Sequence, residues 1–166
     1  MSPILDQNAI EVFSRSTEQT RRLGMRLGTL LKTGDVICLA GELGTGKTTF
    51  VQGIAAGWGS FDSASSPTFV LVNLYRRTGG ERLYHLDAYR ISGPMEAEDL
   101  DIEDLISKGA MVVEWADRIK AALPPENLWI HLKWRQETQR DLFFTAQGKH
   151  YQSLLVDFRQ RVYGGD

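Results

Sequence analysis

A short apolar run followed by a glycine-rich loop restricts the possible folds of this 166-residue chain more narrowly than any other segment. The run, residues 35–40 (DVICLA), is rich in β-branched residues and is typical of a buried strand. The loop, residues 41–48 (GELGTGKT), matches the pattern G-x-x-x-x-G-K-[ST] at every position. Helical spacing of apolar residues follows over residues 49–58. This order of strand, loop and helix predicts a P-loop.

Each residue type in this loop has a chemical role. Glycines leave room for backbone N–H groups to surround phosphate oxygens, where a side chain would collide. The following helix points the positive end of its dipole at the anion. Lys47 would reach the β- and γ-phosphates, and the Thr48 hydroxyl would bind Mg²⁺. The chain has no N/T-K-x-D stretch of the kind that guanine recognition usually requires, so we expect the nucleotide to be ATP.

The rest of the chain alternates predicted helices and strands, so we expect a single α/β domain over residues 1–166. A helix is predicted to begin after Ser16, an N-cap with Gln19 at the capping-box position, and to end at Gly34. A glycine turn at 78–80 joins two of the strands in a hairpin, which makes the central sheet of this P-loop NTPase fold mixed. The other predicted strands are 68–76, 82–89, 110–115, 127–134 and 142–146, and the other predicted helices are 95–109, 116–123 and 151–162.

Composition narrows the class of protein further. The chain is 42% hydrophobic and 24% charged, as in ordinary globular domains, and its longest apolar runs are far short of the ~18 residues that span a bilayer. Its first residues lack a basic segment followed by an apolar one, so we expect no signal peptide and a cytoplasmic location. Cys38 is the single cysteine, which excludes an internal disulfide. A net charge of −2 argues against binding nucleic acid by bulk charge.

Two acidic residues at predicted strand ends are candidates for the second Mg²⁺ partner: Asp87 and Glu114. For either acid alone, a solvated carboxylate at a strand end is the alternative interpretation. His85 could orient Asp87 or be a structural histidine. Trp115, beside Glu114, could lie partly in the core and partly in the site, or could be a purely packing tryptophan. Arg90 could pair with a phosphate or with Asp87, or could form a surface ion pair.

Four landmarks occur in a fixed order along the chain: the loop at 41–49, SPTF at 66–69, HLDAYR at 85–90 and VEW at 113–115. Together they resemble the bacterial TsaE (YjeE) family, the ATPase component of tRNA threonylcarbamoyladenosine biosynthesis. The resemblance extends over about residues 16–140. It implies that SPTF is the first switch of the family and HLDAYR the second.

The resemblance also implies roles for individual residues. Thr48 and Glu114 match the magnesium-associated positions, and Asp87 matches the Walker-B-like acid, so that Lys47, Asp87 and Glu114 form the expected catalytic set. Thr17 lies where the N-terminal segment of the family contacts the nucleotide, and Arg140 lies where a late basic residue does so. The loop residues expected to bind the nucleotide are Gly41, Leu43, Gly44, Thr45, Gly46, Lys47, Thr48 and Thr49.

By resemblance, the protein is a Mg²⁺-dependent ATPase that is slow alone and is stimulated by the TsaD–TsaB pair, which transfers threonylcarbamoyl to the adenosine following the anticodon. The tRNA would be reached only indirectly, through that complex. Two alternatives stay open. A small-molecule kinase would need an arginine-bearing lid, whereas the one insertion-like stretch, residues 93–109, is acidic. A non-catalytic adaptor would bind ATP and work without hydrolysing it.

Overall fold

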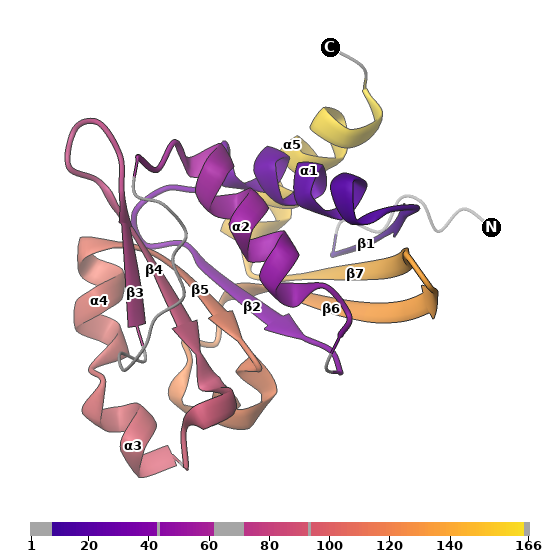
Figure 1. Ribbon diagram of the computed structural model, residues 1–166. Coiled ribbons are helices and arrows are strands. Elements are labelled where there is room, and N and C mark those ends of the chain that lie inside the picture. Colours follow the sequence, from indigo (N-terminus) through magenta and orange to yellow (C-terminus); the bar gives the residue numbers. More distant parts are fainter. Residues whose placement is uncertain (1–7, 43, 62–71, 93, 165–166) are drawn as a thin grey trace.

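Seven strands form one mixed sheet in the computed structural model, which describes residues 8–42, 44–61, 72–92 and 94–164 (Figure 1). The strands are β1 (Ala9–Ser14), β2 (Val36–Ala40), β3 (Val72–Arg76), β4 (Arg82–Asp87), β5 (Gly109–Glu114), β6 (Asn127–Gln136) and β7 (Gln139–Gln147). Their spatial order is β1-β7-β6-β2-β5-β4-β3. The neighbours β6, β2, β5 and β4 run parallel, whereas β1, β7 and β3 pair antiparallel with their neighbours. The predicted mixed α/β sheet is thus confirmed.

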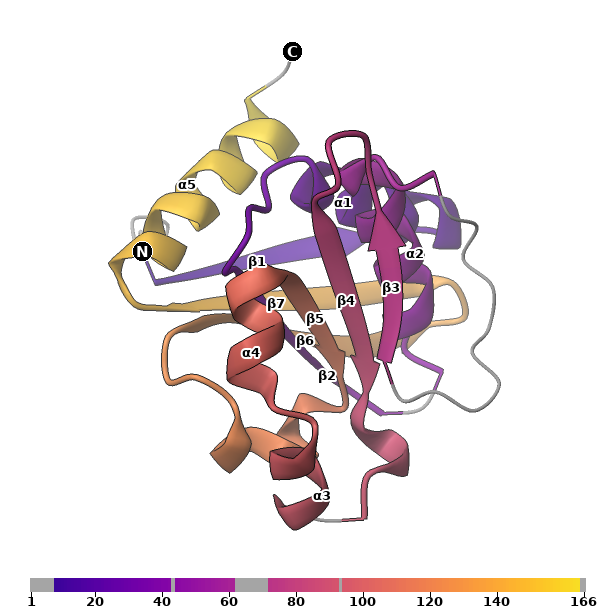
Figure 2. The same ribbon diagram turned by 90° about the vertical axis from the view of Figure 1, so that its left-hand side faces the viewer.

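Helices cover both faces of this sheet. One face carries α1 (Thr17–Gly28), α2 (Lys47–Trp58) and α5 (Lys149–Tyr163). The other face carries α3 (Pro94–Asp99), α4 (Ile102–Lys108) and the 3₁₀ segment η3 (Ala116–Ala122), and Figure 2 shows α3 and α4 on the opposite side of the sheet from α1 and α2. A second 3₁₀ turn, η2 (Ala88–Arg90), follows β4. None of the helices in the described ranges has the length and hydrophobicity that a membrane span requires.

The central strand β2 has apolar side chains on both faces and is buried at all five positions. Ile37 and Leu39 belong to the core cluster under α1, α2 and α5, while Val36 and Cys38 belong to the cluster under α3, α4 and η3. A parallel strand covered on both faces reads as a continuous apolar run. This is why residues 35–40 could be predicted as a strand from composition alone.

Helices α1 and α2 approach so closely that their backbones are in contact. Four glycines line the contact, Gly24 and Gly28 on α1 and Gly53 and Gly57 on α2. A Cβ atom at Gly53 would lie 2.1 Å from the Arg21 carbonyl oxygen. This packing brings the beginning of α1 beside the beginning of α2, directly at the glycine-rich loop.

The beginning of α1 is as predicted, but its end is not. The Ser16 hydroxyl accepts a hydrogen bond from the backbone N–H of Gln19 at 3.0 Å, as an N-cap does. The helix ends at Gly28 instead of at Gly34. Strand β1 was not predicted, because it is an edge strand that pairs only with β7, more than 120 residues further along the chain.

The acidic segment 95–109 forms two helices, so the prediction of one was wrong. Asp101 adopts a left-handed backbone conformation (φ 51°) and caps α4 by accepting a hydrogen bond from the Asp104 backbone N–H. The segment predicted as a helix at 116–123 is the 3₁₀ segment η3. Of the strand predicted at 68–76, the structure describes β3 from Val72, and the SPTF segment lies outside the described residues.

Burial in the sheet core raises the pKa of several groups, and the largest shifts are those of Cys38 and Tyr151. Burial raises the pKa of the Cys38 thiol to about 12. The Tyr151 hydroxyl accepts a hydrogen bond from the Val36 backbone N–H at 2.9 Å, yet burial outweighs this bond and raises the Tyr151 pKa to about 12. Both groups therefore stay protonated in the folded chain at pH values where they ionise in the unfolded chain.

We expect alkaline pH to destabilise the fold for this reason. Above pH 9, near the ordinary pKa of a thiol, the unfolded chain loses protons that the folded chain retains, so the free energy of unfolding falls as the pH rises toward 12. Urea unfolding at several pH values between 8 and 11 measures this slope. Replacing Cys38 by Ala should reduce the slope, and a free energy of unfolding that rises over this range would contradict the prediction.

Candidate functional site

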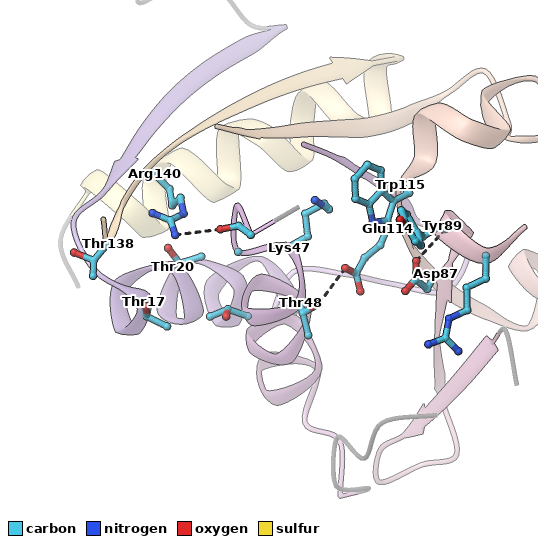
Figure 3. A pocket seen from close by; sticks show the side chains of 14 residues that line it. Thr17, Thr20, Lys47, Thr48, Asp87, Tyr89, Glu114, Trp115, Thr138 and Arg140 are labelled. Atoms are coloured by element: carbon cyan, nitrogen blue, oxygen red, sulfur yellow. Dashed lines mark hydrogen bonds between the residues drawn. The ribbon is translucent and has the colours of Figure 1, made fainter. Parts of the chain in front are cut away.

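A cavity of about 470 Å³ lies where the parallel strands β2, β4 and β5 end (Figure 3). Clefts that bind small molecules have this size, and in parallel sheets they form at the carboxyl ends of the strands. Side chains from α1, from the glycine-rich loop with the start of α2, and from the ends of β4 and β5 converge there. The lining residues are Thr17, Thr20, Gly44, Gly46, Lys47, Thr48, Thr49, Asp87, Tyr89, Arg90, Glu114, Trp115, Thr138 and Arg140.

The loop takes a backbone conformation that favours glycine at three positions, the first of which, Gly41, has a φ of 145°. Gly44 and Gly46 have φ values of 81° and 97°, in the left-handed region that L side chains avoid. Gly46 is the N-cap of α2 and brings no side chain to bond the helix terminus. The N-terminus of α2 therefore meets the cavity without a capping side chain, which suits an anion.

Lys47, the lysine of the motif, is buried beneath this loop. Its ammonium group donates hydrogen bonds to the carbonyl oxygens of Gly41 at 2.5 Å and Glu42 at 2.7 Å. It also lies 4.2 Å from the centre of the Trp115 ring, a cation–π contact. Burial lowers the Lys47 pKa, and nearby carboxylates, Glu114 foremost, act in the opposite direction. The ammonium group is thus held in the loop by groups that phosphate oxygens can replace.

The two predicted acids lie side by side at the ends of neighbouring strands, since Asp87 and Glu114 are register partners in β4 and β5. One oxygen of Glu114 accepts a hydrogen bond from the Thr48 hydroxyl at 3.2 Å, and the other lies 2.6 Å from His85 Nε2. Asp87 accepts a hydrogen bond from the Tyr89 backbone N–H. His85 therefore contacts Glu114, and the interpretation that it orients Asp87 was wrong.

Arg140 fixes the loop from the other side of the cavity. Its guanidinium group donates hydrogen bonds to the carbonyl oxygens of Gly44 at 3.2 Å and Thr45 at 3.1 Å. It also donates to carbonyls of the β6–β7 turn, those of Gln136, Glu137 and Gln139. Arg140 thus connects the glycine-rich loop to this turn through backbone oxygens.

The donor set of the cavity fits Mg²⁺. The Thr48 hydroxyl and the Glu114 and Asp87 carboxylates are all oxygen ligands, which this ion prefers. In the part of the chain that the structure describes, no cluster of three His, Cys, Asp or Glu side chains could hold a metal on its own. Mg²⁺ is usually bound by one or two carboxylates together with substrate phosphates. The site therefore suits a magnesium–nucleotide complex more than a free ion.

The cavity brings together most residues predicted from the sequence. The catalytic candidates Lys47, Asp87 and Glu114 all line it, as do Thr17 and Arg140 and the loop residues Gly44, Gly46, Thr48 and Thr49. Gly41 and Thr45 belong to the loop without lining the cavity, and Leu43 lies outside the described residues. Trp115 lines the cavity and packs against the core, as expected.

Two lining threonines were not predicted. Thr20 lies one helical turn after Thr17, and that spacing of three residues could have revealed it. Thr138 comes from the β6–β7 turn and donates a hydrogen bond to the Arg15 carbonyl oxygen at 3.3 Å. No local sequence signal identifies Thr138, because only the packing of the hairpin brings it to the cavity.

The fold and the cavity define a P-loop protein. A glycine-rich loop joins the central strand of a mixed sheet to the next helix, and carboxylates lie at the ends of adjacent strands. The sequence model of the family described as "Threonylcarbamoyl adenosine biosynthesis protein TsaE" matches residues 14–142. The chain belongs to the TsaE family. The resemblance of the four landmarks to this family is thereby confirmed.

Individual relatives agree with this assignment. The chain is 39% identical over 141 residues to the tRNA threonylcarbamoyladenosine biosynthesis protein TsaE of Bacillus subtilis, covering 84% of this chain and 87% of that protein. It is 36% identical over 130 residues to the protein of the same name from Treponema pallidum, covering 78% and 95%. The crystal structure of Bacillus subtilis YdiB superposes with a TM-score of 0.76 at 31% identity, covering 93% of this chain and 96% of that one.

Proposed function

We propose that this protein binds ATP with Mg²⁺ in the cavity and hydrolyses it, as the ATPase of threonylcarbamoyladenosine formation on tRNA. One observation carries the proposal: the Thr48 hydroxyl is hydrogen-bonded to Glu114, whose carboxylate also acts electrostatically on the Lys47 ammonium group, in a cavity that Asp87 also lines. Phosphoryl transfer needs positioning and charge neutralisation more than covalent participation by the protein, and this arrangement supplies both. The relatives' names support the pathway.

Each group has a part in this proposal. Lys47 exchanges the Gly41 and Glu42 carbonyls for β- and γ-phosphate oxygens, and the N-terminus of α2 receives the remaining phosphate charge. Thr48 would hold Mg²⁺ with one of the two acids, and the ion when bound would neutralise charge on the phosphates. The remaining acid orients or activates the attacking water.

The hydrogen bonds of Arg140 support the proposal that catalysis depends on a partner. The Arg140 guanidinium is occupied by five backbone carbonyls, and Arg90 lies exposed at the cavity. An arginine that stabilises the transition-state charge is worth orders of magnitude in rate and can be supplied in trans. We therefore infer slow turnover alone and stimulation by the TsaD–TsaB pair, with tRNA reached only through that complex.

ATP turnover by the purified chain, alone and with TsaD and TsaB, tests this proposal. We expect slow phosphate release alone, a clear increase with the partners, and loss of both in Lys47→Ala. Lys32→Ala, which removes an exposed lysine outside the cavity, should behave like the wild type and is the matched control. Tight ATP binding without turnover would identify a nucleotide-dependent adaptor, and a stoichiometric phosphorylated small molecule would identify a kinase.

A further inference from the structure

A buried histidine lies behind the proposed metal site. His85 is in β4, and its Nε2 atom is 2.6 Å from one carboxylate oxygen of Glu114. The side chains of His85 and Glu114 are only 10% and 6% exposed. The second oxygen of Glu114 accepts a hydrogen bond from the Thr48 hydroxyl at 3.2 Å. Both oxygens of this carboxylate are therefore held by neighbouring side chains, one from β4 and one from α2.

The other ring nitrogen indicates which partner donates. His85 Nδ1 is buried, and among the described residues no group is hydrogen-bonded to it. A hydrogen on Nδ1 would be a buried donor without an acceptor, which is costly. The neutral ring with its single hydrogen on Nε2 avoids this cost, because the hydrogen then points at the Glu114 carboxylate. His85 is thus the donor of this contact.

Packing keeps the imidazole ring in place. The Tyr75 ring of the edge strand β3 stacks near it, with centroids 6.4 Å apart and planes inclined by 22°. On the backbone, His85 pairs with Asn73 on one side and Val112 on the other. The position of Nε2 is therefore fixed by three strands of the sheet.

We propose that His85 is a positioning residue of the magnesium–nucleotide site. It holds one oxygen of Glu114, and so keeps the other oxygen at the Thr48 hydroxyl, where the ion would bind. His85 lines no part of the cavity and acts only through Glu114. This inference rests on the proposed function, because it assigns His85 to the binding of Mg²⁺ with the nucleotide.

Two substitutions separate this role from packing. His85→Phe keeps an aromatic ring beside Tyr75, somewhat larger than the imidazole, but removes the donor, whereas His85→Gln supplies an amide N–H donor at similar reach. Binding of a non-hydrolysable ATP analogue to the full chain is titrated at a series of Mg²⁺ concentrations. Loss of such a supporting hydrogen bond typically weakens metal affinity about 10- to 100-fold. We therefore expect the Mg²⁺ concentration at half-saturation to rise by this factor in His85→Phe, and by less than about threefold in His85→Gln.

The remaining outcomes decide the matter. Binding of the analogue without Mg²⁺ should be the same in His85→Phe and the wild type, and His85→Phe should add nothing in a Glu114→Ala background. The role is overturned if the Mg²⁺ concentration at half-saturation is unchanged in His85→Phe. It is also overturned if His85→Phe weakens binding of the analogue without Mg²⁺ as much as with Mg²⁺. If His85→Phe does not fold, His85→Leu gives the same comparison. A wild-type chain that binds the analogue equally with and without Mg²⁺ overturns the proposed function, and this inference with it.

Discussion

Replacing Glu114 by Gln is expected to lower partner-stimulated ATP hydrolysis by about 100-fold or more. The glutamine keeps the volume of the side chain and an oxygen that can accept the Thr48 hydroxyl, but it removes the negative charge from the centre of the site. That charge is buried between Thr48 and His85, where no solvent replaces it. Steady-state phosphate release in the presence of TsaD and TsaB measures the change.

A matched control tests whether charge or position matters. Asp117 also acts on the Lys47 ammonium group electrostatically, but it is exposed in η3 and does not line the cavity. Asp117→Asn removes the same charge and should leave the rate within about twofold of the wild type, as for a surface substitution away from the site. If Glu114→Gln and Asp87→Asn both hydrolysed ATP at the wild-type rate, the assignment of the metal site would be wrong.

Replacing Gly53 by Ala is expected to reduce the free energy of unfolding by about 1–3 kcal/mol or more, although Ala is the better helix former. The new methyl group would lie 2.1 Å from the Arg21 carbonyl oxygen, and its next contacts are also backbone atoms of α1. Backbone atoms cannot rotate away as a flexible side chain can, so the two helices must separate. Urea unfolding monitored by circular dichroism measures the loss.

The neighbouring residue provides the control for this substitution. Gln52 is exposed on the same helix, and Gln52→Ala should change the free energy of unfolding by no more than about 0.5 kcal/mol. A Gly53→Ala variant as stable as the wild type would show that α1 and α2 can separate without loss. Reduced nucleotide binding in a folded Gly53→Ala chain would instead connect this packing to the cavity, because both helices contribute residues that line it.

The parts of the fold that could be predicted from the sequence have local causes. The apolar composition of β2, the glycines of the loop and the Ser16 cap each act within a few residues. Strand β1 and the division between α3 and α4 could not be predicted in this way. The first depends on pairing with β7, and the second on the left-handed conformation of Asp101.

The candidate site shows the same distinction. Lys47 and Thr48 could be placed because the loop motif fixes their spacing, and Asp87 and Glu114 because each ends a recognisable strand. The sequence could not predict that His85 contacts Glu114, because Asp87 is much closer to His85 along the chain. The register between β4 and β5 pairs His85 with Val112, two residues before Glu114, so the contact joins side chains that are diagonal neighbours on adjacent strands.

The contact between Lys47 and Trp115 has a practical consequence for spectroscopy. Indole fluorescence responds to charge near the ring, and here the ammonium group of the loop lies 4.2 Å from the ring centre. A ligand that draws Lys47 away changes the emission of Trp115 without any attached dye. Trp58 and Trp129 lie beside other cations outside the cavity, Arg77 at 3.6 Å and Lys120 at 5.7 Å, and Trp134 is exposed at the end of β6. The chain thus contains an intrinsic optical probe of its own loop, with which occupancy can be followed in real time.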